Sequence, residues 1–456
     1  MRPLQLARLS LFQGCLGCLA VIFAGMLNRI MISELAFPAL LVGGALAFEQ
    51  LMAPARVMFG QVSDRWPLRG RHRTPYIWMG TIGFCGLATL SIPVIFATAS
   101  ALQSGAATAI TGWTLCLCGL FALYGLAISA ASTPYLALVI DLTDESERPR
   151  AVGIIWCMLT IGIIAGAIAI SITTRSLDGI SDPEVLKAAL QTFMNRVALV
   201  IGAIVLLATI GIEPASRRLE AGNQASKQGV TLRQSWALIR SSRQILIFFA
   251  FLLCFTLGLF LQDPILESYG AEVFGMPISK TTLLNAFWGT GTLVGLLIAG
   301  LWFTPTFGKL RSARTGCWMI LASLLLLVAA GLIANTGTLL VVMVLFGLSA
   351  GIGTNSALSL MLDLTLPQLA GTFVGVWGLA QAMSRALGKV MGGGLLDLGR
   401  LVSGADQPLP AFAFVFVIEA GVVLIAIWIL GRLNTAEFRK DTETKLETLL
   451  MASLDD

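Results

Sequence analysis

Apolar runs long enough to cross a membrane recur along the whole chain, and they restrict the fold more than any other feature. A run of roughly 20 residues forms a helix that spans about 30 Å of hydrocarbon, whereas a membrane β-barrel would show alternating segments of about 10 residues. The composition agrees, because 56% of the 456 residues are hydrophobic, only 12% are charged and the mean hydropathy is +0.85. We therefore expect an all-helical protein that crosses the membrane many times.

The sequence contains twelve such runs, and each is expected to form one membrane-spanning helix. They occupy residues 10–32, 38–59, 75–98, 111–134, 151–172, 195–213, 244–266, 282–303, 315–334, 338–361, 372–395 and 410–431. If the N-terminus is cytoplasmic, 22 of the 30 Lys and Arg residues fall in cytoplasmic loops and tails, and six fall outside. Because cytoplasmic loops carry the excess of positive charge, both termini are predicted to be cytoplasmic.

A long stretch of the first half of the chain returns in the second half without a gap. Residues 123–143 (LYGLAISAASTPYLALVIDLT) align with residues 345–365 (LFGLSAGIGTNSALSLMLDLT), 222 positions later, and seven of the 21 aligned residues are identical. The identities include the final Asp-Leu-Thr, which chance matches among apolar residues would hardly supply. Residues 27–35 likewise resemble residues 261–269. Parallel repeats of several spans are a common transporter plan.

The repeat predicts two homologous halves of six helices each. The stretch between the sixth and seventh runs is rich in Arg, Gly, Gln and Ser, as expected of a loop that joins two halves. We therefore predict an N-terminal six-helix half at residues 1–213, a cytoplasmic linker at 214–243, a C-terminal six-helix half at 244–431 and a cytoplasmic tail at 432–456.

Motifs of enzymatic chemistry are absent from the sequence. It contains no nucleotide-binding loop, no cluster of metal-ligand residues and no catalytic Ser-His-Asp set. Its basic loops are explained by anionic lipid headgroups and do not require nucleic acid. We therefore expect a membrane protein without enzymatic activity, a metal site or a nucleic-acid partner.

A glycine, an acidic residue and several basic residues follow the second run, beginning with GQVSDR at residues 60–65. Glycine lets two helix ends approach closely, and the charged groups can hold neighbouring helices until the halves rock apart. Further acidic and basic residues precede the fifth run. The alternative is positive charge that only orients the protein. We predict a cytoplasmic latch formed by Gly60, Asp64, Arg65, Arg71, Arg73, Asp141, Arg148 and Arg150.

The repeat and this loop resemble the major facilitator superfamily, which implies an all-α fold with 12 transmembrane helices in two six-helix halves. Shorter stretches narrow the resemblance. They are SLFQ from Ser10, LNRIMISEL from Leu27, RHRTPYIWMG from Arg71, DLTDESERPRAVG from Asp141, LQDPILESYGAEVFGMP from Leu261 and VWGLAQAMSRALGKVMGGG from Val376. Together they look like the PucC/LhaA family of bacteriochlorophyll delivery proteins over nearly the whole chain. The sequence departs modestly at Ser268, where relatives often have Pro, and at Pro264.

The resemblance implies a light-harvesting antenna assembly factor that delivers bacteriochlorophyll to antenna polypeptides. Its place would be the cytoplasmic or intracytoplasmic photosynthetic membrane of a bacterium. Its cargo would be bacteriochlorophyll, and its partners would be antenna polypeptides, pigment-synthesis enzymes and membrane lipid. Two alternatives stay open: a scaffold or chaperone for antenna subunits that moves no pigment, and a proton-coupled small-solute transporter with Glu49 or Glu419 as the proton carrier.

Several polar side chains lie inside or at the edges of apolar runs, where an ionisable group is costly unless it is paired. Arg29 aligns with Asp263 in the repeat, so we predict that the two pair across the interface between the halves; alternatively, both extend to the external surface. For any single polar residue, interhelical hydrogen bonding that fixes the bundle is the competing interpretation. The intramembrane polar residues are Asn28, Arg29, Glu34, Glu49, Gln50, Gln262, Asp263, Glu267, Gln381, Arg385 and Glu419.

A magnesium chlorin would need an axial ligand and an apolar surface. His72 is the only histidine and lies in a cytoplasmic loop, so no run supplies imidazole, which fits a carrier that releases its pigment. Carboxylate and amide oxygens are alternative ligands for magnesium. Three tryptophans lie deeper in their runs than those of the usual interfacial belt. The candidate pigment contacts are Glu49, Gln50, Trp156, Trp288 and Trp377.

Overall fold

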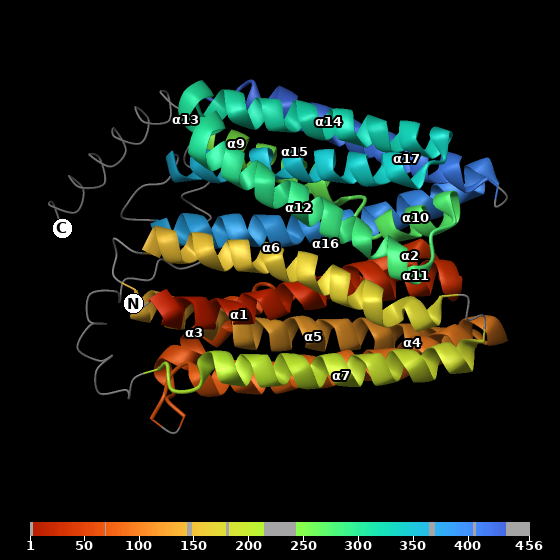
Figure 1. Cartoon of the computed structure of the whole chain (residues 1–456), viewed down its shortest axis with the longest axis horizontal. Coiled ribbons are helices and arrows are strands. Elements are labelled where there is room, and N and C mark those ends of the chain that lie inside the picture. The colour runs from red at the N-terminus through yellow and green to blue at the C-terminus, as the bar shows by residue number, and fades with distance from the viewer. Residues whose placement is uncertain are drawn as a thin grey trace, which may run out of the picture.

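The computed structural model describes residues 3–68, 70–143, 148–178, 182–213, 243–363, 370–404 and 407–434. Over these residues the backbone is almost entirely helical and forms no β-strand. Long helices lie side by side along the long axis of the molecule (Figure 1). Within the described residues, eleven helical segments are long and apolar enough to cross a membrane. The expectation of an all-helical, many-span membrane protein is confirmed.

The helices before residue 210 pack mainly against one another and are called the N-terminal group. The first of them continues beyond Ala20 through wider, π-helical turns, so that one span covers Leu4–Glu34. The helices of the group are α1 (Pro3–Ala20), α2 (Ala39–Leu51), α3 (Ala55–Arg65), α4 (Thr74–Ser104), α5 (Ala107–Leu142), α6 (Arg148–Thr173) and α7 (Pro183–Thr209).

The helices after residue 242 also pack mainly against one another and are called the C-terminal group. The helix of the eleventh predicted run is as long as its neighbours, but Gln381, Arg385 and Lys389 make it too polar to count among the eleven apolar segments. The helices of the group are α9 (Arg243–Phe260), α10 (Leu266–Phe274), α11 (Ile278–Thr281), α12 (Leu283–Ile298), α13 (Thr304–Phe307), α14 (Lys309–Ile333), α15 (Thr336–Asp363), α16 (Ala370–Ser403) and α17 (Pro408–Leu430).

Three of the predicted runs differ from the observed helices. The run at 38–59 is divided between α2, which ends at Leu51, and α3, which begins at Ala55. The run at 195–213 is the second part of the longer helix α7, which begins at Pro183 because Asp182 accepts a hydrogen bond from the backbone N–H of Glu184 at 3.0 Å. The run at 244–266 is interrupted after Phe260, because Pro264 has no N–H group and cannot continue a helix. The chain becomes helical again in α10.

Most of the contact between the groups is made by two helix pairs, α2 with α16 and α6 with α12. In Figure 1 they run through the middle of the molecule, with α14 along one edge and α7 along the other. The backbones of α2 and α16 lie very close together: a Cβ atom on Gly43 would collide with the carbonyl oxygen of Lys389, and one on Gly393 with that of Ala39. Small residues allow this close approach of membrane helices.

The division of the chain at residues 1–213, 214–243, 244–431 and 432–456 stays a prediction. Residues 214–242 of the linker and 435–456 of the tail lie outside the described part of the chain. Aromatic pairs pack within each group, with the rings of Phe12 and Tyr135 4.4 Å apart in one and those of Tyr269 and Phe416 5.0 Å apart in the other. The buried hydrophobic residues form one continuous cluster through both groups.

Candidate functional site

Polar side chains hold the break between α9 and α10. The backbone N–H of Gln262 donates to Glu419 Oε1 at 3.3 Å, and Asn28 Nδ2 donates to the carbonyl oxygen of Pro264. Glu419 is fully buried in α17, and Asn28 belongs to the first span. Within a membrane, backbone groups freed by a break must find partners inside the protein. The side chains of Asn28 and Glu419, two of the predicted intramembrane polar residues, therefore have a structural task.

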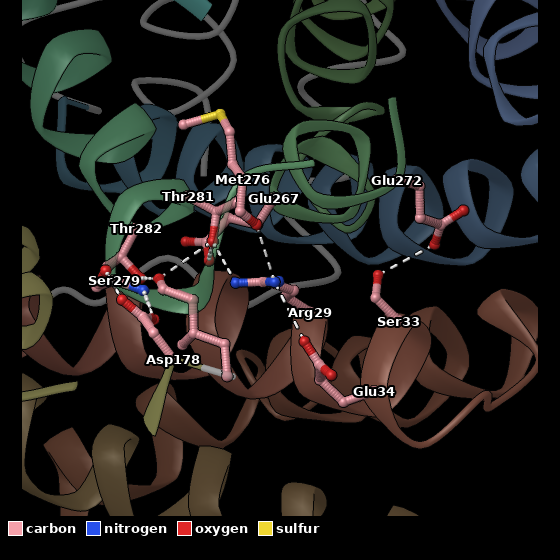
Figure 2. A network of polar contacts seen from close by, with 11 residues as sticks. Arg29, Ser33, Glu34, Asp178, Glu267, Glu272, Met276, Ser279, Thr281 and Thr282 are labelled. Carbon is pink, nitrogen blue, oxygen red and sulfur yellow. Dashed lines mark hydrogen bonds and ion pairs between the residues drawn. The ribbon is translucent and has the colours of Figure 1, made fainter. Parts of the chain in front are cut away.

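Arg29 connects the two groups at the end of the bundle away from the N-terminus (Figure 2). The residue is 4% exposed and pairs with Glu34 Oε1 on its own span at 3.1 Å. It also donates to Thr281 Oγ1 at 3.0 Å and to the carbonyl oxygen of Met276 at 3.1 Å, both in the C-terminal group. A buried guanidinium is tolerated where it is paired and hydrogen-bonded in this way.

The predicted pair of Arg29 with Asp263 is wrong. Arg29 forms its ion pair with Glu34, and the carboxylate of the C-terminal group that acts on it is Glu267. Glu267 is 2% exposed and accepts hydrogen bonds from Asn285 Nδ2 at 2.6 Å and Thr281 Oγ1 at 3.4 Å. The alignment assumed an unbroken helix at Asp263, whereas α9 ends at Phe260 and Asp263 lies in the break before α10.

Further contacts cross between the groups at the same end. Ser33 Oγ donates across the groups to Glu272 at 3.0 Å (Figure 2). Within the C-terminal group, Arg400 Nη2 holds this carboxylate by donating to both of its oxygens at 2.8 Å. The backbone N–H of Ser279 donates to Asp178 at 3.1 Å. We call these contacts the far-end network, and its members are Arg29, Ser33, Glu34, Asp178, Glu267, Glu272, Ser279, Thr281, Asp397 and Arg400.

Asp397 of α16 caps the start of α2. Its two carboxylate oxygens accept hydrogen bonds from the backbone N–H groups of Ala39 at 2.9 Å and Leu40 at 2.7 Å. The first N–H groups of a helix have no partner within it, and a negative charge is favourable there. Pro38 precedes α2 and has no side-chain acceptor, so the cap comes from the other group. The sequence analysis did not select Asp397, although its place near the end of a run was a signal.

Replacing Asp397 with Ala is expected to lower the free energy of unfolding by about 1 kcal/mol, the usual contribution of a helix cap. Asp397→Asn keeps an acceptor oxygen and should lose less. Both variants would be unfolded by an SDS titration of the detergent-solubilised chain. An Ala variant as stable as the unchanged chain would show that the cap contributes nothing.

A second cluster lies where α2 meets α16. Glu49 Oε2 and Lys389 Nζ form an ion pair at 3.6 Å, with side chains 19% and 8% exposed, and Gln50 Nε2 donates to Glu49 Oε1 at 3.2 Å. Asp263 and Arg385 are close enough to act on this pair electrostatically. These five residues are called the central cluster. Glu49, a predicted magnesium ligand, is thus held by Lys389 and Gln50.

The predicted tryptophan contacts differ in their surroundings. Trp288 and Trp377 are half-buried, and the indole N–H of each is buried without a hydrogen-bond partner among the described residues. The ring of Trp288 meets the ring of Phe260 edge-on, with centroids 6.4 Å apart. Trp156 is 48% exposed. Gln381 lies on α16 one turn from Arg385 and is half-buried.

The predicted latch residues gather around Arg73 at the N-terminal end of the bundle. Arg73 is 5% exposed, and its Nη1 lies 2.5 Å from Asp64 Oδ1 and 2.7 Å from Ser63 Oγ. Its Nε lies 3.0 Å from Asp141 Oδ2 on α5. One guanidinium therefore joins the loop before α4 to two neighbouring helices, as a planar group with several donors can.

Glu213 completes this arrangement, and the sequence analysis missed it. Its carboxylate accepts hydrogen bonds from three successive backbone N–H groups, those of His72, Arg73 and Thr74, at 2.6, 2.9 and 2.7 Å. It thereby caps α4 from the end of α7. All these contacts stay within the N-terminal group, so in this conformation they do not link the two groups.

The remaining latch residues take less part. A Cβ atom on Gly60 would meet only Thr133 Cγ2 at 3.5 Å, an ordinary contact, so Gly60 does not serve the close helix approach that we expected. Arg65 is exposed and Arg71 half-buried, and neither forms an ion pair with a described residue. The side chains of Arg148 and Arg150 lie outside what the structure describes.

A family of known proteins matches most of this chain. The model of the family described as PUCC protein matches residues 26–438. A Rhodobacter capsulatus protein described as an uncharacterized protein in the puhA-bchM intergenic region is 30% identical over 450 residues, which cover 94% of this chain and 89% of that protein. Protein PucC of the same species is 29% identical over 93% of this chain and 90% of its own length. The bacteriochlorophyll synthase 44.5 kDa chain of Rhodobacter capsulatus is 30% identical over 93% of this chain and 94% of its own length.

Solved structures share the fold. A D-xylose-proton symporter superposes with a TM-score of 0.70 at 13% identity, covering 95% of this chain and 98% of its own. A bacterial homologue of the lysosomal transporter Spinster, inward-facing and unoccupied, superposes with a TM-score of 0.69 at 15% identity, covering 97% of this chain and 99% of its own. At these identities the likeness shows the fold alone. It confirms the all-α fold of major facilitator type that the sequence predicted.

Proposed function

This chain belongs to the PUCC protein family, and on that basis we propose that it is a light-harvesting antenna assembly factor that delivers bacteriochlorophyll to antenna polypeptides in the photosynthetic membrane. The observation that carries the proposal is the match of the family model to residues 26–438. A relative named for bacteriochlorophyll synthase aligns over 93% of the chain. The transporter-type fold also supports the proposal, because its two helix groups lie in the membrane, where an apolar cargo would be found.

The geometry between the groups is compatible with an aromatic cargo. The central cluster, Phe260 and the half-buried Trp288 place charge and flat rings where α2, α9, α12 and α16 come together. His72 supplies no ligand there, because its Nδ1 lies 3.2 Å from the carbonyl oxygen of Ser63 beside the latch. Without an imidazole ligand, a pigment would be held weakly enough to be passed on.

The proposed orientation puts the latch end in the cytoplasm, with both termini, and the far-end network on the opposite side. The excess of Lys and Arg at the latch end supports it. We propose that the chain performs no enzymatic reaction: its residues bind, orient and release cargo. Its partners are proposed to be antenna polypeptides and the enzymes that supply the pigment.

The proposal predicts that the full chain, purified in mild detergent from a phototrophic host, retains a chlorin with a bacteriochlorophyll absorption spectrum. A host blocked in pigment synthesis should yield colourless protein that takes up added pigment. Protein that is colourless from both hosts and binds no added pigment would contradict delivery. If that colourless protein still co-purified antenna subunits, the scaffold alternative would replace it.

The proton-coupled alternative finds less support in the contacts of Glu49 than in those of Glu419. Glu49 is held in an ion pair with Lys389, which would be lost on protonation. Glu419 accepts the backbone N–H of Gln262 with Oε1, and its Oε2 has no partner among the described residues, so it could take up a proton and keep this contact. Uptake of a small solute that collapses in Glu49→Gln or Glu419→Gln would favour this alternative.

A further inference from the structure

Arg385 lies near the middle of a long helix, between the two groups. At 1.5 Å per residue, it sits about 22 Å along α16 from Ala370 and about 27 Å from Ser403. Its side chain is half-buried, and its Nε is fully buried. The charge of Arg385 therefore has to be stabilised in the middle of the bundle, by the protein, by water between the groups or by something that the protein binds.

The guanidinium of Arg385 has no polar partner in the described part of the chain. Its Nε is buried without a hydrogen bond, and none of its nitrogens forms an ion pair with a described carboxylate. Its contact is with the ring of Phe260, 4.2 Å from the guanidinium carbon to the centroid. Asp263 and Glu49 act on it from a distance, but Arg56 adds a like charge and Glu49 is already paired with Lys389.

The Lys and Arg residues that are buried in the described part of the chain all have a carboxylate partner, which Arg385 lacks. Arg29 pairs with Glu34 and makes two further hydrogen bonds, Arg73 bridges two carboxylates, and Lys389 pairs with Glu49. The attraction of a guanidinium to one aromatic ring offsets only part of the cost of withdrawing its charge from water. The contacts of the empty bundle therefore do not account for the place of Arg385.

Unpartnered donors continue along the same face of α16. Trp377, Gln381 and Arg385 follow one another at four-residue spacing, which places them in one row. The indole N–H of Trp377 and that of Trp288 on α12 are buried without acceptors among the described residues. Arg385 and the two indoles thus offer N–H groups beside flat rings, and the matching ligand is a flat apolar molecule that carries acceptor oxygens.

We infer that Arg385 binds a carboxylate on a flat, apolar ring system, whose rings lie beside Phe260, Trp288 and Trp377. A carboxylate gives a guanidinium two parallel charge-assisted hydrogen bonds, whereas an ester offers only neutral acceptors. The inference rests on the proposed function and refines it: the tetrapyrrole that Arg385 binds carries a free propionate, the form that precedes the esterified bacteriochlorophyll of the antenna.

The test uses two probes that differ only in this group, pyropheophorbide a and its methyl ester. Each is titrated by fluorescence into the full chain in detergent. The unchanged chain should bind the acid about tenfold or more tightly than the ester, the difference that one charge-assisted interaction supplies. Arg385→Gln should bind acid and ester equally. Arg385→Lys keeps the charge without the paired donors and should retain only part of the preference.

The matched control is Arg432→Gln, because Arg432 also lies over an aromatic ring, 3.6 Å from the centroid of Trp428, near the end of α17. It should keep the full preference for the acid. If Arg385→Gln does not fold, the Arg385→Lys titration decides alone, and an undiminished preference there overturns the inference.

The other outcomes separate the inference from the function on which it rests. Equal binding of acid and ester by the unchanged chain would overturn the inferred contact between Arg385 and a carboxylate, and would leave the proposed delivery of pigment unaffected. Binding of neither probe would overturn the inference and count against delivery as well. Displacement of the acid by phosphatidylglycerol but not by phosphatidylcholine would assign the anion to a lipid phosphate and overturn the tetrapyrrole carboxylate.

Discussion

Replacing Lys389 with Met is expected to lower the free energy of unfolding by about 3–5 kcal/mol, the cost of leaving one partner of a buried ion pair without the other. Lys389 and Glu49 have side chains 8% and 19% exposed, and they meet 3.6 Å apart on helices from different groups. Their helices touch at Gly43 and Gly393, so Glu49 cannot easily swing into water when Lys389 is lost. The measurement is an SDS titration of the detergent-solubilised chain.

Two further variants decide whether the lost pair is the cause. Glu49→Gln combined with Lys389→Met removes both charges and should regain much of the lost stability. Lys187 forms a 3.9 Å ion pair with Glu184, and the two side chains are 38% and 82% exposed. Lys187→Met should therefore change the free energy of unfolding by less than about 1 kcal/mol. Equal losses from Lys389→Met and Lys187→Met would show that the central pair does not hold the groups together.

The helices could be predicted from the sequence because the membrane fixes their length. A bilayer accepts only segments whose backbone groups are paired within the segment, so apolar runs and helices coincide. The prediction failed at Asp263, where a proline inside an apolar run ended the helix. It also placed the start of the sixth span too late, because the residues from Pro183 onward are too polar to indicate a membrane span although they form the first turns of the same helix, α7.

The partners of the polar side chains could not be predicted in the same way. Arg29 could be identified as a buried charge, but its partners Glu34, Thr281 and Met276 depend on the rotation of each helix and on the turn at Pro264. A repeat alignment gives depth in the membrane and not the direction in which a side chain points.

Helix caps supplied by a distant element were the second failure. Glu213 caps α4 across 139 to 141 positions, and Asp397 caps α2 across more than 350. A sequence pattern reveals a cap only when the acceptor is adjacent to the helix that it caps. Both residues lie at or near the end of an apolar run, where an acidic side chain is a weak indication that it caps another helix.

Replacing Arg73 with Met is expected to lower the free energy of unfolding by about 3 kcal/mol. The guanidinium joins Asp64, Asp141 and Ser63 within 3.0 Å while the residue is only 5% exposed. Asp64 has a side chain 58% exposed and will regain water, so most of the cost comes from Asp141, whose side chain is 14% exposed. The titration used for Lys389 measures the loss.

Arg71→Met is the matched control, because it removes the same charge from the same loop and Arg71 has no ion pair with a described residue. It should leave the stability within about 0.5 kcal/mol of the unchanged chain. Arg73→Lys should fall between the two, since an ammonium can meet one carboxylate but does not span both as a guanidinium does. Glu213 holds the backbone of residues 72–74 in all three variants, so the loop stays in place and the differences report the side chain. If Arg73→Met and Arg71→Met were equally stable, the contacts of Arg73 would add nothing beyond those of an ordinary basic loop, and these residues would not form a latch.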